Sequence, residues 1–361
     1  MSAFKKNTFL FPLLLLGCFF FIGLHIYSDY GASADEHIQI DGGHIYWRTL
    51  MRLLNQKYPE EFDELPELDQ FQNRYYGQAA MFPVVIYEAI HNFSQDSSTI
   101  IAVRHLWSFL CYFAAAFLFA LLIQRFWQDQ YLTSAALLLL ILQPRLFGDI
   151  FYNDRDLMLI SWMLIFLFCF DTLIRKKTRI WVLLTGFSMA MAVNTRIFGA
   201  VLIIFPAIQF IKGAHKKGMI FMMLSALAFM FVLYPIAWGN PLRILPQAAE
   251  HFLKHQRSLD TGCNARLLFM NQKYYEHQLP WYYLPVYTLI STPVTHLIFG
   301  SFGFILYLHE LLRRRSRPEN YLYLCMLLIF ISVMAGVFLT HPTFYNGWRH
   351  FYFLRSEEAH V

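Results

Sequence analysis

Apolar runs alternate with short polar segments along the whole of the 361-residue chain. A helix needs about 20 consecutive apolar residues to cross a bilayer, and many of these runs reach or approach that length. The pattern predicts an all-α polytopic membrane protein with about nine transmembrane helices. The expected spans are 9–27, 101–123, 131–144, 157–174, 180–194, 197–211, 219–238, 284–312 and 321–339.

Some of these runs are short for a full crossing, namely 131–144, 180–194 and 197–211. Thr195 and Arg196 separate the last two of them. We therefore expect 180–211 to form a hairpin of two half-length helices, which counts as two crossings.

Composition points to the same class of protein. Hydrophobic residues make up 57% of the chain and charged residues 15%, whereas soluble domains carry about 25% charged residues. The first run follows Lys5 and Lys6, as in a signal peptide, and "LLGC" resembles a lipoprotein cleavage site. The run continues beyond Cys18 through "FFFIGLHIY", which favours an uncleaved first span.

The basic residues of the short connecting segments predict the orientation. Cytoplasmic loops carry an excess of Lys and Arg, and a cytoplasmic N-terminus places every strong basic cluster on the cytoplasmic side. These clusters are Lys5/Lys6, Arg125, Arg175–Lys177 with Arg179, Lys212 with Lys216/Lys217, and Arg313–Arg315 with Arg317. The expected location is the inner (plasma) membrane. Short, membrane-flanking basic tracts argue against nucleic-acid binding.

The longer polar segments then fall together on the extracytoplasmic side. They are a long first loop, 28–100, a second loop, 145–156, a fourth loop, 239–283, and a last segment, 340–361. Binding and catalytic residues concentrate on loops held by a rigid scaffold, so we expect the chemistry on this side.

Acidic residues gather in the first two of these loops. Asp35 and Glu36 follow the first span closely, while Asp149, Asp154 and Asp156 cluster in the second loop. A single acid in a loop is usually a solvated charge, but an ionisable group at a membrane edge is costly unless it is paired or functional. Two acidic loops could therefore face each other at one interface.

Positively charged residues on the same side also need an explanation, because Lys and Arg are enriched in cytoplasmic loops and not in extracytoplasmic ones. They are Arg104, Arg145, Arg155, Arg196, Arg349 and His350. Each either pairs with a nearby acid or belongs to a phosphate clamp, since guanidinium binds phosphate oxygens in a bidentate way. A carboxylate beside a lipid phosphate can deprotonate an acceptor hydroxyl or help to hold a divalent cation, Mg²⁺ or Mn²⁺. The need for a metal stays open.

At this point the chain resembles the GT-C membrane glycosyltransferases. The resemblance is to their phospholipid-carrier-dependent branch, which includes the protein O-mannosyltransferases and bacterial lipid A aminoarabinose transferase. The segments that carry it are "ADEHIQIDGG", "NRYYG", "PRLFGDIFYNDRD", "LPWYYLPVYTLISTP" and "YNGWRHFYF". The family's second-loop pattern is often R-F-x-x-x-x-F-N-P-K-D. Here Asp154–Arg155 replaces Pro–Lys, and Asp156 matches the terminal acid.

The resemblance implies a GT-C fold in a single transmembrane domain, 1–361, with a long first extracytoplasmic loop. It implies a hexosyl- or pentosyltransferase that uses a polyprenyl-phosphate-linked sugar and an inverting single displacement. The acceptor, whether glycan, lipid or protein, is open. The first-loop catalytic acid carries over to Asp35, with Glu36 beside it, and the second-loop acid to Asp156. Arg349 and His350 carry over as contacts of the donor phosphate or substrate.

Other functions stay open at this stage. The chain ends at "RSEEAHV" soon after the last segment, so the resemblance implies a C-terminally short member, and a truncated inactive GT-C homologue is one alternative. A transporter or flippase of lipid-linked sugars is another. Such a protein more often buries charge at mid-membrane on broken helices of two pseudo-symmetric halves.

Overall fold

A computed structural model describes residues 9–33, 36–58, 62–91, 97–213, 215–239, 266–275, 279–280 and 282–312, with short pieces of 243–250 and 324–331. The described chain is nearly all-α, which confirms the all-α part of the expected fold class. It divides into two compact units, Met1–Ala200 with Gly213–Pro241, and Val201–Lys212 with Leu242–Val361.

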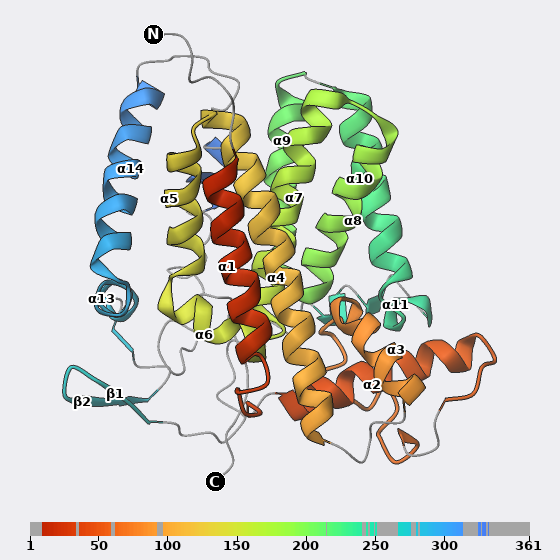
Figure 1. Ribbon diagram of the computed structural model, residues 1–361. Helices are drawn as coiled ribbons and strands as arrows, with labels where there is room; N and C mark the ends of the chain where they lie inside the picture. Colours follow the sequence, from red (N-terminus) through yellow and green to blue (C-terminus); the bar gives the residue numbers. More distant parts are fainter. Residues whose placement is uncertain are drawn as a thin grey trace. The chain divides into compact units, whose positions relative to one another are not determined.

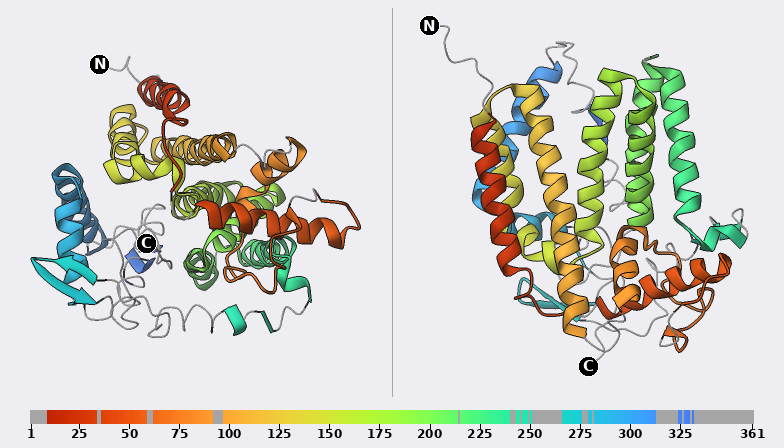
Figure 2. Two further views of the ribbon diagram at one scale, coloured as in Figure 1. Left: turned by 90° about the horizontal axis from the view of Figure 1, so that it is seen from below. Right: turned by 45° about the vertical axis from the view of Figure 1, so that its right-hand side comes forward.

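The first unit is a bundle of long helices, closed at one end by shorter ones (Figure 1). The long helices are α1 (Leu10–Ile26), α4 (Ser97–Trp127), α5 (Gln130–Ile141), α7 (Asp156–Lys176), α8 (Arg179–Thr195) and α10 (Lys216–Val232). The shorter ones are α2 (Glu36–Leu53), η2 (Ala79–Met81), α3 (Phe82–His91), α6 (Pro144–Tyr152) and α11 (Ile236–Gly239). Because α4, α5, α7 and α8 alternate in direction, the N-terminal ends of α4 and α7 lie at the same end as α2 and α3 (Figures 1 and 2).

The second unit contains α9 (Ile204–Ile211), α13 (Tyr283–Ser291), α14 (Val294–Leu312) and a β-hairpin. The segment Ile197–Ile203, which leads into α9, is a 3₁₀ helix. Strand β1 (Arg266–Phe269) pairs antiparallel with β2 (Gln272–Tyr275). Their two-residue turn has φ of 47° at Met270 and 62° at Asn271, as a type I′ hairpin turn requires. The sequence predicted only a loop over 239–283, so the hairpin was missed.

The helices support membrane insertion, although fewer of them qualify as full spans than the sequence predicts. Within the described residues, Ser98–Trp127 and Asp156–Lys176 are long and apolar enough to cross a membrane. Helices α5 and α6 add a third if they count as one span bent by 62°. Shorter apolar helices are Leu10–Ile26, Ala79–His91, Ile197–Ile211 and Val294–Leu306. The total of nine stays a prediction, and most of the expected span 321–339 lies outside the described residues.

The apolar side chains on the outer faces of the helices fit a lipid environment. Large exposed apolar residues on three helices are Leu13, Leu14, Phe21, Ile22, Phe221, Leu224, Leu227, Ile298, Phe299, Phe302 and Ile305. Hydroxyls inside helices donate to carbonyls of their own helix, as Ser161 does to Leu157 and Thr195 to Met191. Such bonds satisfy polar groups where no water is present.

The second polar segment, 145–156, was expected to be a loop, but most of it is helix α6. Pro144 occupies the first turn, and the side chain of Gln143 accepts a hydrogen bond from the Leu146 N–H at 2.6 Å. Both features favour a helix start. The helix buries Ile150 and Phe151 in an aromatic core. This amphipathic packing explains why the segment is helical.

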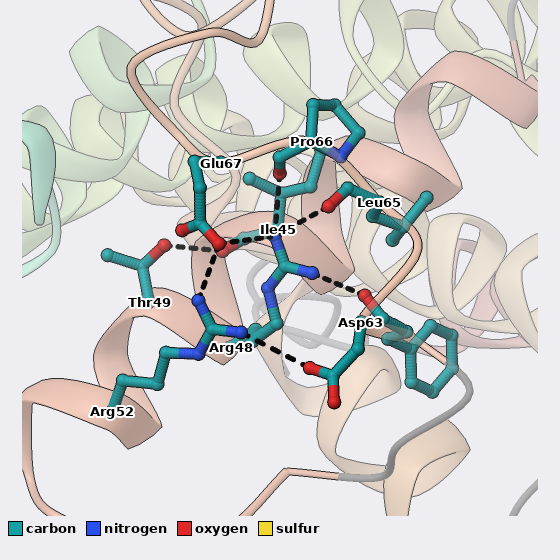
Figure 3. A network of polar contacts seen from close by, with 9 residues as sticks. Ile45, Arg48, Thr49, Arg52, Asp63, Leu65, Pro66 and Glu67 are labelled. Atoms are coloured by element: carbon teal, nitrogen blue, oxygen red, sulfur yellow. Dashed lines mark hydrogen bonds and ion pairs between the residues drawn. The ribbon is translucent and has the colours of Figure 1, made fainter.

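The first polar segment contains helices α2 and α3, and a buried arginine fastens a further part of it to α2 (Figure 3). Arg48 has no exposed surface and donates to the carbonyls of Phe62, Leu65 and Pro66, the last two at 3.0 and 2.6 Å. One turn on, Arg52 pairs at the surface with Glu67 at 2.6 Å and with Asp63 at 3.2 Å. These contacts hold 62–67 against the helix.

Candidate functional site

Helix α4 carries a buried arginine about two turns from its N-terminus. The Arg104 Nε and Nη2 atoms lie 2.7 and 2.9 Å from the two carboxylate oxygens of Glu88 on α3. The Nε2 atom of His44 on α2 lies 3.1 Å from Glu88 Oε2, and its Nδ1 atom 2.6 Å from the Tyr58 hydroxyl. Arg104, Glu88 and His44 are all buried.

The electrostatics of Glu88 follow from these partners. Burial alone would raise the pKa of Glu88, but the hydrogen bond from His44 and the charge of Arg104 outweigh burial and lower the pKa. Glu88 is therefore ionised and fixes three elements, α2, α3 and α4, to one another.

The paired glycines of "IDGGH" allow this close approach of α2. A Cβ atom at Gly43 would lie 2.8 Å from Val85 Cγ2 of α3 and 3.5 Å from Arg104 Nη2. A Cβ at Gly42 would lie 2.9 Å from Gln78 Nε2. Side chains at these two positions would push α2 away from the arginine.

A second buried pair joins the start of α2 to α4. Glu36 Oε1 lies 2.7 Å from His105 Nε2, and Glu36 Oε2 accepts a hydrogen bond from the Ser33 N–H. His105 Nδ1 lies 3.2 Å from the Tyr27 carbonyl. Because that carbonyl can only accept, Nδ1 is the donor in this contact, and Nε2 faces the Glu36 carboxylate.

Side chains in and beside the segment between α6 and α7 form hydrogen bonds with one another and with its backbone. Asn153 accepts from the Asp156 N–H at 2.9 Å and donates to Asp156 Oδ2 at 3.1 Å and Asp149 Oδ2 at 3.4 Å. The Tyr152 hydroxyl donates to Asp149 Oδ1 at 2.6 Å. Arg196 Nε lies 2.7 Å from Asp156 Oδ1. Asp156 is therefore engaged through both oxygens.

Arg196 follows the end of α8, at a point where the first polar segment is also anchored. Asn194 accepts from the Ala79 N–H at 2.9 Å and donates to the Leu233 carbonyl at 3.2 Å. A Cβ at Gly77 would lie 2.4 Å from Asn194. Only glycine fits where "NRYYG" meets this helix end.

Arg155 connects the same two regions. Its guanidinium lies over the ring of Tyr76, 4.7 Å from the ring centre, a distance typical of a cation–π interaction. The two segments that the sequence predicted to face each other therefore touch at this position.

Asp154 lies where these groups meet. It is 6% exposed, and its Oδ2 atom lies 4.0 Å from Arg104 Nη1. Burial is the largest cause that raises the pKa of Asp154 to about 6. The positive charges of Arg155 and Arg104 lower this pKa, and the negative charges of Glu36 and Asp156 raise it. We call the whole set the acid–arginine cluster. Its members are Glu36, Glu88, Arg104, His105, Asp149, Asp154, Arg155, Asp156 and Arg196.

The structure thus brings together seven of the residues that the sequence singled out: Glu36, Arg104, Asp149, Asp154, Arg155, Asp156 and Arg196. Arg145 lies in the first turn of α6, half-buried, and takes no part in the contacts described above. Asp35, Arg349 and His350 lie outside the described residues.

Sequence reasoning missed several partners in the cluster. His105 adjoins Arg104, and Glu88 interrupts the apolar stretch "MFPVVIYEAIH". A lone glutamate in such a stretch is itself a signal, since a buried carboxylate needs a partner. His44 offered no comparable signal, because its pairing with Glu88 depends on how α2 crosses α3.

The cluster offers no ready ligand set for a cation. Among the residues that the structure describes, no three His, Cys, Asp or Glu side chains form a group that could hold a metal ion. The carboxylates are instead engaged by arginine, histidine and amide donors. Whether Mg²⁺ or Mn²⁺ takes part therefore stays open.

Comparisons of the chain with models of protein families, with curated protein sequences and with solved structures each find no match. The likeness to GT-C enzymes therefore depends on the short motifs alone. The chemistry of the cluster is an independent line of argument.

Proposed function

We propose that this protein is a membrane glycosyltransferase that moves a sugar from a polyprenyl-phosphate carrier to an acceptor hydroxyl. The proposed reaction is an inverting single displacement on the extracytoplasmic side. The observation that carries the proposal is the acid–arginine cluster, which joins carboxylates of two polar segments to three arginines at one end of an apolar helix bundle.

The position of the cluster suits a lipid phosphate. Its members Arg104 and Asp156 lie near the N-terminal ends of α4 and α7, the two helices that qualify as full spans among the residues that the structure describes. A polyprenyl chain lies among lipid tails while its phosphate stays at the membrane edge. Charged groups at the end of a span therefore meet the phosphate, whereas charges at mid-membrane would not.

The residue types also suit the reaction. Arginine is always charged and matches phosphate oxygens with paired donors, so Arg155 and Arg196 would stabilise the leaving phosphate. A carboxylate beside the sugar takes the acceptor proton. Asp35, immediately before Glu36, keeps the role that the family resemblance implies.

The motifs support the same function. Three of the five GT-C-like segments supply or anchor cluster residues: "ADEHIQIDGG" provides Glu36, "NRYYG" contacts Arg155 and Asn194, and "PRLFGDIFYNDRD" provides Asp149 to Asp156. Their meeting at one end of the bundle supports a shared site.

The orientation is proposed from the opposite end of the bundle. There, Asp171 is held by Arg125 at 2.7 Å and by Arg175 at 2.9 Å, close to Lys176, Lys177 and Arg179 in the sequence. The orientation rule assigns this basic end to the cytoplasm. The acid–arginine cluster would then face the extracytoplasmic side.

The test is sugar transfer in membranes that contain the full chain. Radiolabelled polyprenyl-phosphate hexoses and pentoses serve as donors, and label is followed into glycan, lipid and protein acceptors. We expect transfer by wild type and a loss of about a hundredfold in Asp35→Asn, the scale for loss of a catalytic carboxylate. Asp69→Asn, a change at an exposed residue of the same polar segment, is the matched control.

Two outcomes would overturn this proposal. Absence of transfer from every donor would exclude an active transferase, and movement of a lipid-linked sugar across the bilayer without transfer would establish a flippase instead. If transfer occurs but Asp35→Asn is as active as wild type, the assignment of Asp35 is wrong.

A further inference from the structure

Arg104 uses only part of its guanidinium. Arginine has five N–H donors, and here Nε and Nη2 bind Glu88 while Nη1 has no hydrogen-bond partner among the described residues. The side chain is 2% exposed. A buried donor without a partner is costly, so Nη1 marks a position where a ligand oxygen would be stabilised.

Asp154, in turn, has a carboxylate oxygen that lacks a hydrogen-bond donor within the described part of the chain. Its Oδ1 atom is buried and has no hydrogen-bond donor among the described residues, while Oδ2 lies 4.0 Å from Arg104 Nη1. That separation is too long for a direct hydrogen bond. A group that accepts from Arg104 and donates to Asp154 would satisfy both, and a hydroxyl is such a group.

The other described carboxylates of the cluster are fully engaged. Glu36 and Glu88 each receive contacts on both oxygens, and so do Asp149 and Asp156. Asp154 Oδ1 and Asp156 Oδ1 both lack a hydrogen bond among the described residues, but Asp156 Oδ1 lies 2.7 Å from Arg196 Nε, so Asp154 is the one described carboxylate of the cluster with an oxygen that neither a hydrogen bond nor an ion pair engages. It also stands where the GT-C pattern has proline, so the family resemblance assigns it no role.

We propose that Arg104 and Asp154 hold the acceptor hydroxyl and that Asp154 is the base that takes its proton. The inference rests on the proposed function and assigns the proton transfer to Asp154 in place of Asp35, so Asp154→Asn should lose the acidic limb of the pH profile while Asp35→Asn keeps it. Arg104 Nη1 donates to the hydroxyl oxygen and orients it, and Asp154 Oδ1 accepts the hydroxyl hydrogen.

The acceptor oxygen forms a bond to the anomeric carbon of the sugar while the bond from that carbon to the phosphate oxygen breaks. The bonding electron pair leaves with the polyprenyl phosphate. The hydroxyl proton passes to Asp154 and then to water, which restores the carboxylate.

The surroundings of Asp154 make it a stronger base than an ordinary aspartate. The charged groups that face it are Arg104 on α4, Glu36 at the start of α2 with its partner His105, and Arg155 and Asp156 on its own segment. Burial is the main reason that its pKa rises to about 6. A base with a pKa near the working pH is close to the optimum for proton transfer.

The experiment compares wild type, Asp154→Asn and Asp154→Glu between pH 5 and 8. The donor is whichever radiolabelled polyprenyl-phosphate sugar wild type uses. We expect kcat/KM of wild type to fall below about pH 6, because the base is then protonated. We expect Asp154→Asn to lose about a hundredfold in rate and the acidic limb of the profile. Asp154→Glu should keep a measurable acidic limb in its pH profile. Asp69→Asn should have the rate and the pH profile of wild type.

A second measurement separates a base from a structural residue. Because the pKa of Asp154 is raised in the folded chain, the folded state binds more protons than the unfolded state between about pH 4 and 6, and stability falls as pH rises through this window. Asp154→Asn removes the buried charge, so its thermal unfolding midpoint should exceed that of wild type above pH 6. A structural aspartate would give the reverse.

Each outcome decides the inference. Loss of transfer with raised stability supports it. Transfer by wild type with an Asp154→Asn rate within threefold, or with the acidic limb retained, overturns the inference but leaves the proposed function standing. Absence of transfer by wild type overturns both.

Discussion

Two arginines of the first unit are almost completely buried, and they differ in how their donors are used. Arg48 is 0% exposed and gives both Nη atoms to backbone carbonyls of 62–67. Arg104 is 2% exposed and gives only Nε and Nη2 to Glu88. Arg48 holds the segment 62–67 against α2. Arg104 is held in place by Glu88, and its Nη1 atom lies 4.0 Å from Asp154 Oδ2.

The difference suggests how to tell a structural arginine from a binding one. Burial is nearly the same for both, so burial alone does not decide. The partners decide: Arg48 binds three carbonyls of one chain segment and lies 3.9 Å from the exposed Glu67, whereas Glu88 fixes the geometry of Arg104. Glu88 in turn has His44 at 3.1 Å. Such a supporting shell is typical of sites that must keep their geometry.

The largest effect should come from Arg104→Lys. Lysine keeps the charge but lacks the planar fork, so it cannot bind Glu88 through two atoms and reach the acceptor at the same time. We expect transfer to fall by about 10² to 10³, the scale for loss of one oriented donor. The free energy of unfolding should change little, because Glu88 retains His44 and an ammonium. Steady-state transfer at equal folded amounts measures this, and an unfolding-driven loss would contradict it.

Arg48→Lys should show the opposite profile. One ammonium can keep at most part of the three carbonyl contacts, which leaves buried carbonyls without donors. We expect the free energy of unfolding to fall by about 2–4 kcal/mol. Transfer per folded molecule should stay within about threefold of wild type. Denaturant titration in detergent checks the stability, and a catalytic loss larger than that of Arg104→Lys would reverse the assignment of the two arginines.

Glycine substitutions test the anchor of the "NRYYG" segment. Gly77→Ala places a Cβ atom 2.4 Å from Asn194, including its backbone oxygen, and should cost about 1–3 kcal/mol of stability. Gly148→Ala is the matched control, because it lies in α6 with nothing within 4 Å of the added Cβ. Alanine favours a helix, so this change should stabilise by about 0.5–1 kcal/mol. Equal effects of the two changes would contradict the proposed close contact.

The sequence predicted the parts of the fold that depend on continuous apolar runs. The runs 101–123 and 157–174 correspond to α4 and α7, and 180–194 to α8. It missed α2, α3 and α6, because reading for spans assigns every polar stretch to a loop. Each of these helices buries only one face instead of a continuous apolar run. Which face is buried depends on the elements that pack against the helix.

The candidate site shows the same limit. The convergence of Glu36 and Asp156 was expected, since both acids lie next to spans on one side. The partners that position them were not, because His105 lies 69 residues from Glu36 and Glu88 lies 16 residues from Arg104. Pairings at such separations are set by tertiary packing, which local sequence patterns do not encode.

The smallest effect should come from the surface pair beside Arg48. Arg52 lies 2.6 Å from Glu67, and their side chains are 46% and 52% exposed. The hydrogen bond with Arg52 lowers the pKa of Glu67, and the same bond raises that of Arg52, but water and salt screen so exposed a pair. A double-mutant cycle of Arg52→Ala and Glu67→Ala should give a coupling energy of about 0.5 kcal/mol, mostly lost in 1 M salt. A coupling above about 2 kcal/mol that survives salt would mean that this outer pair, and not Arg48 alone, holds the loop.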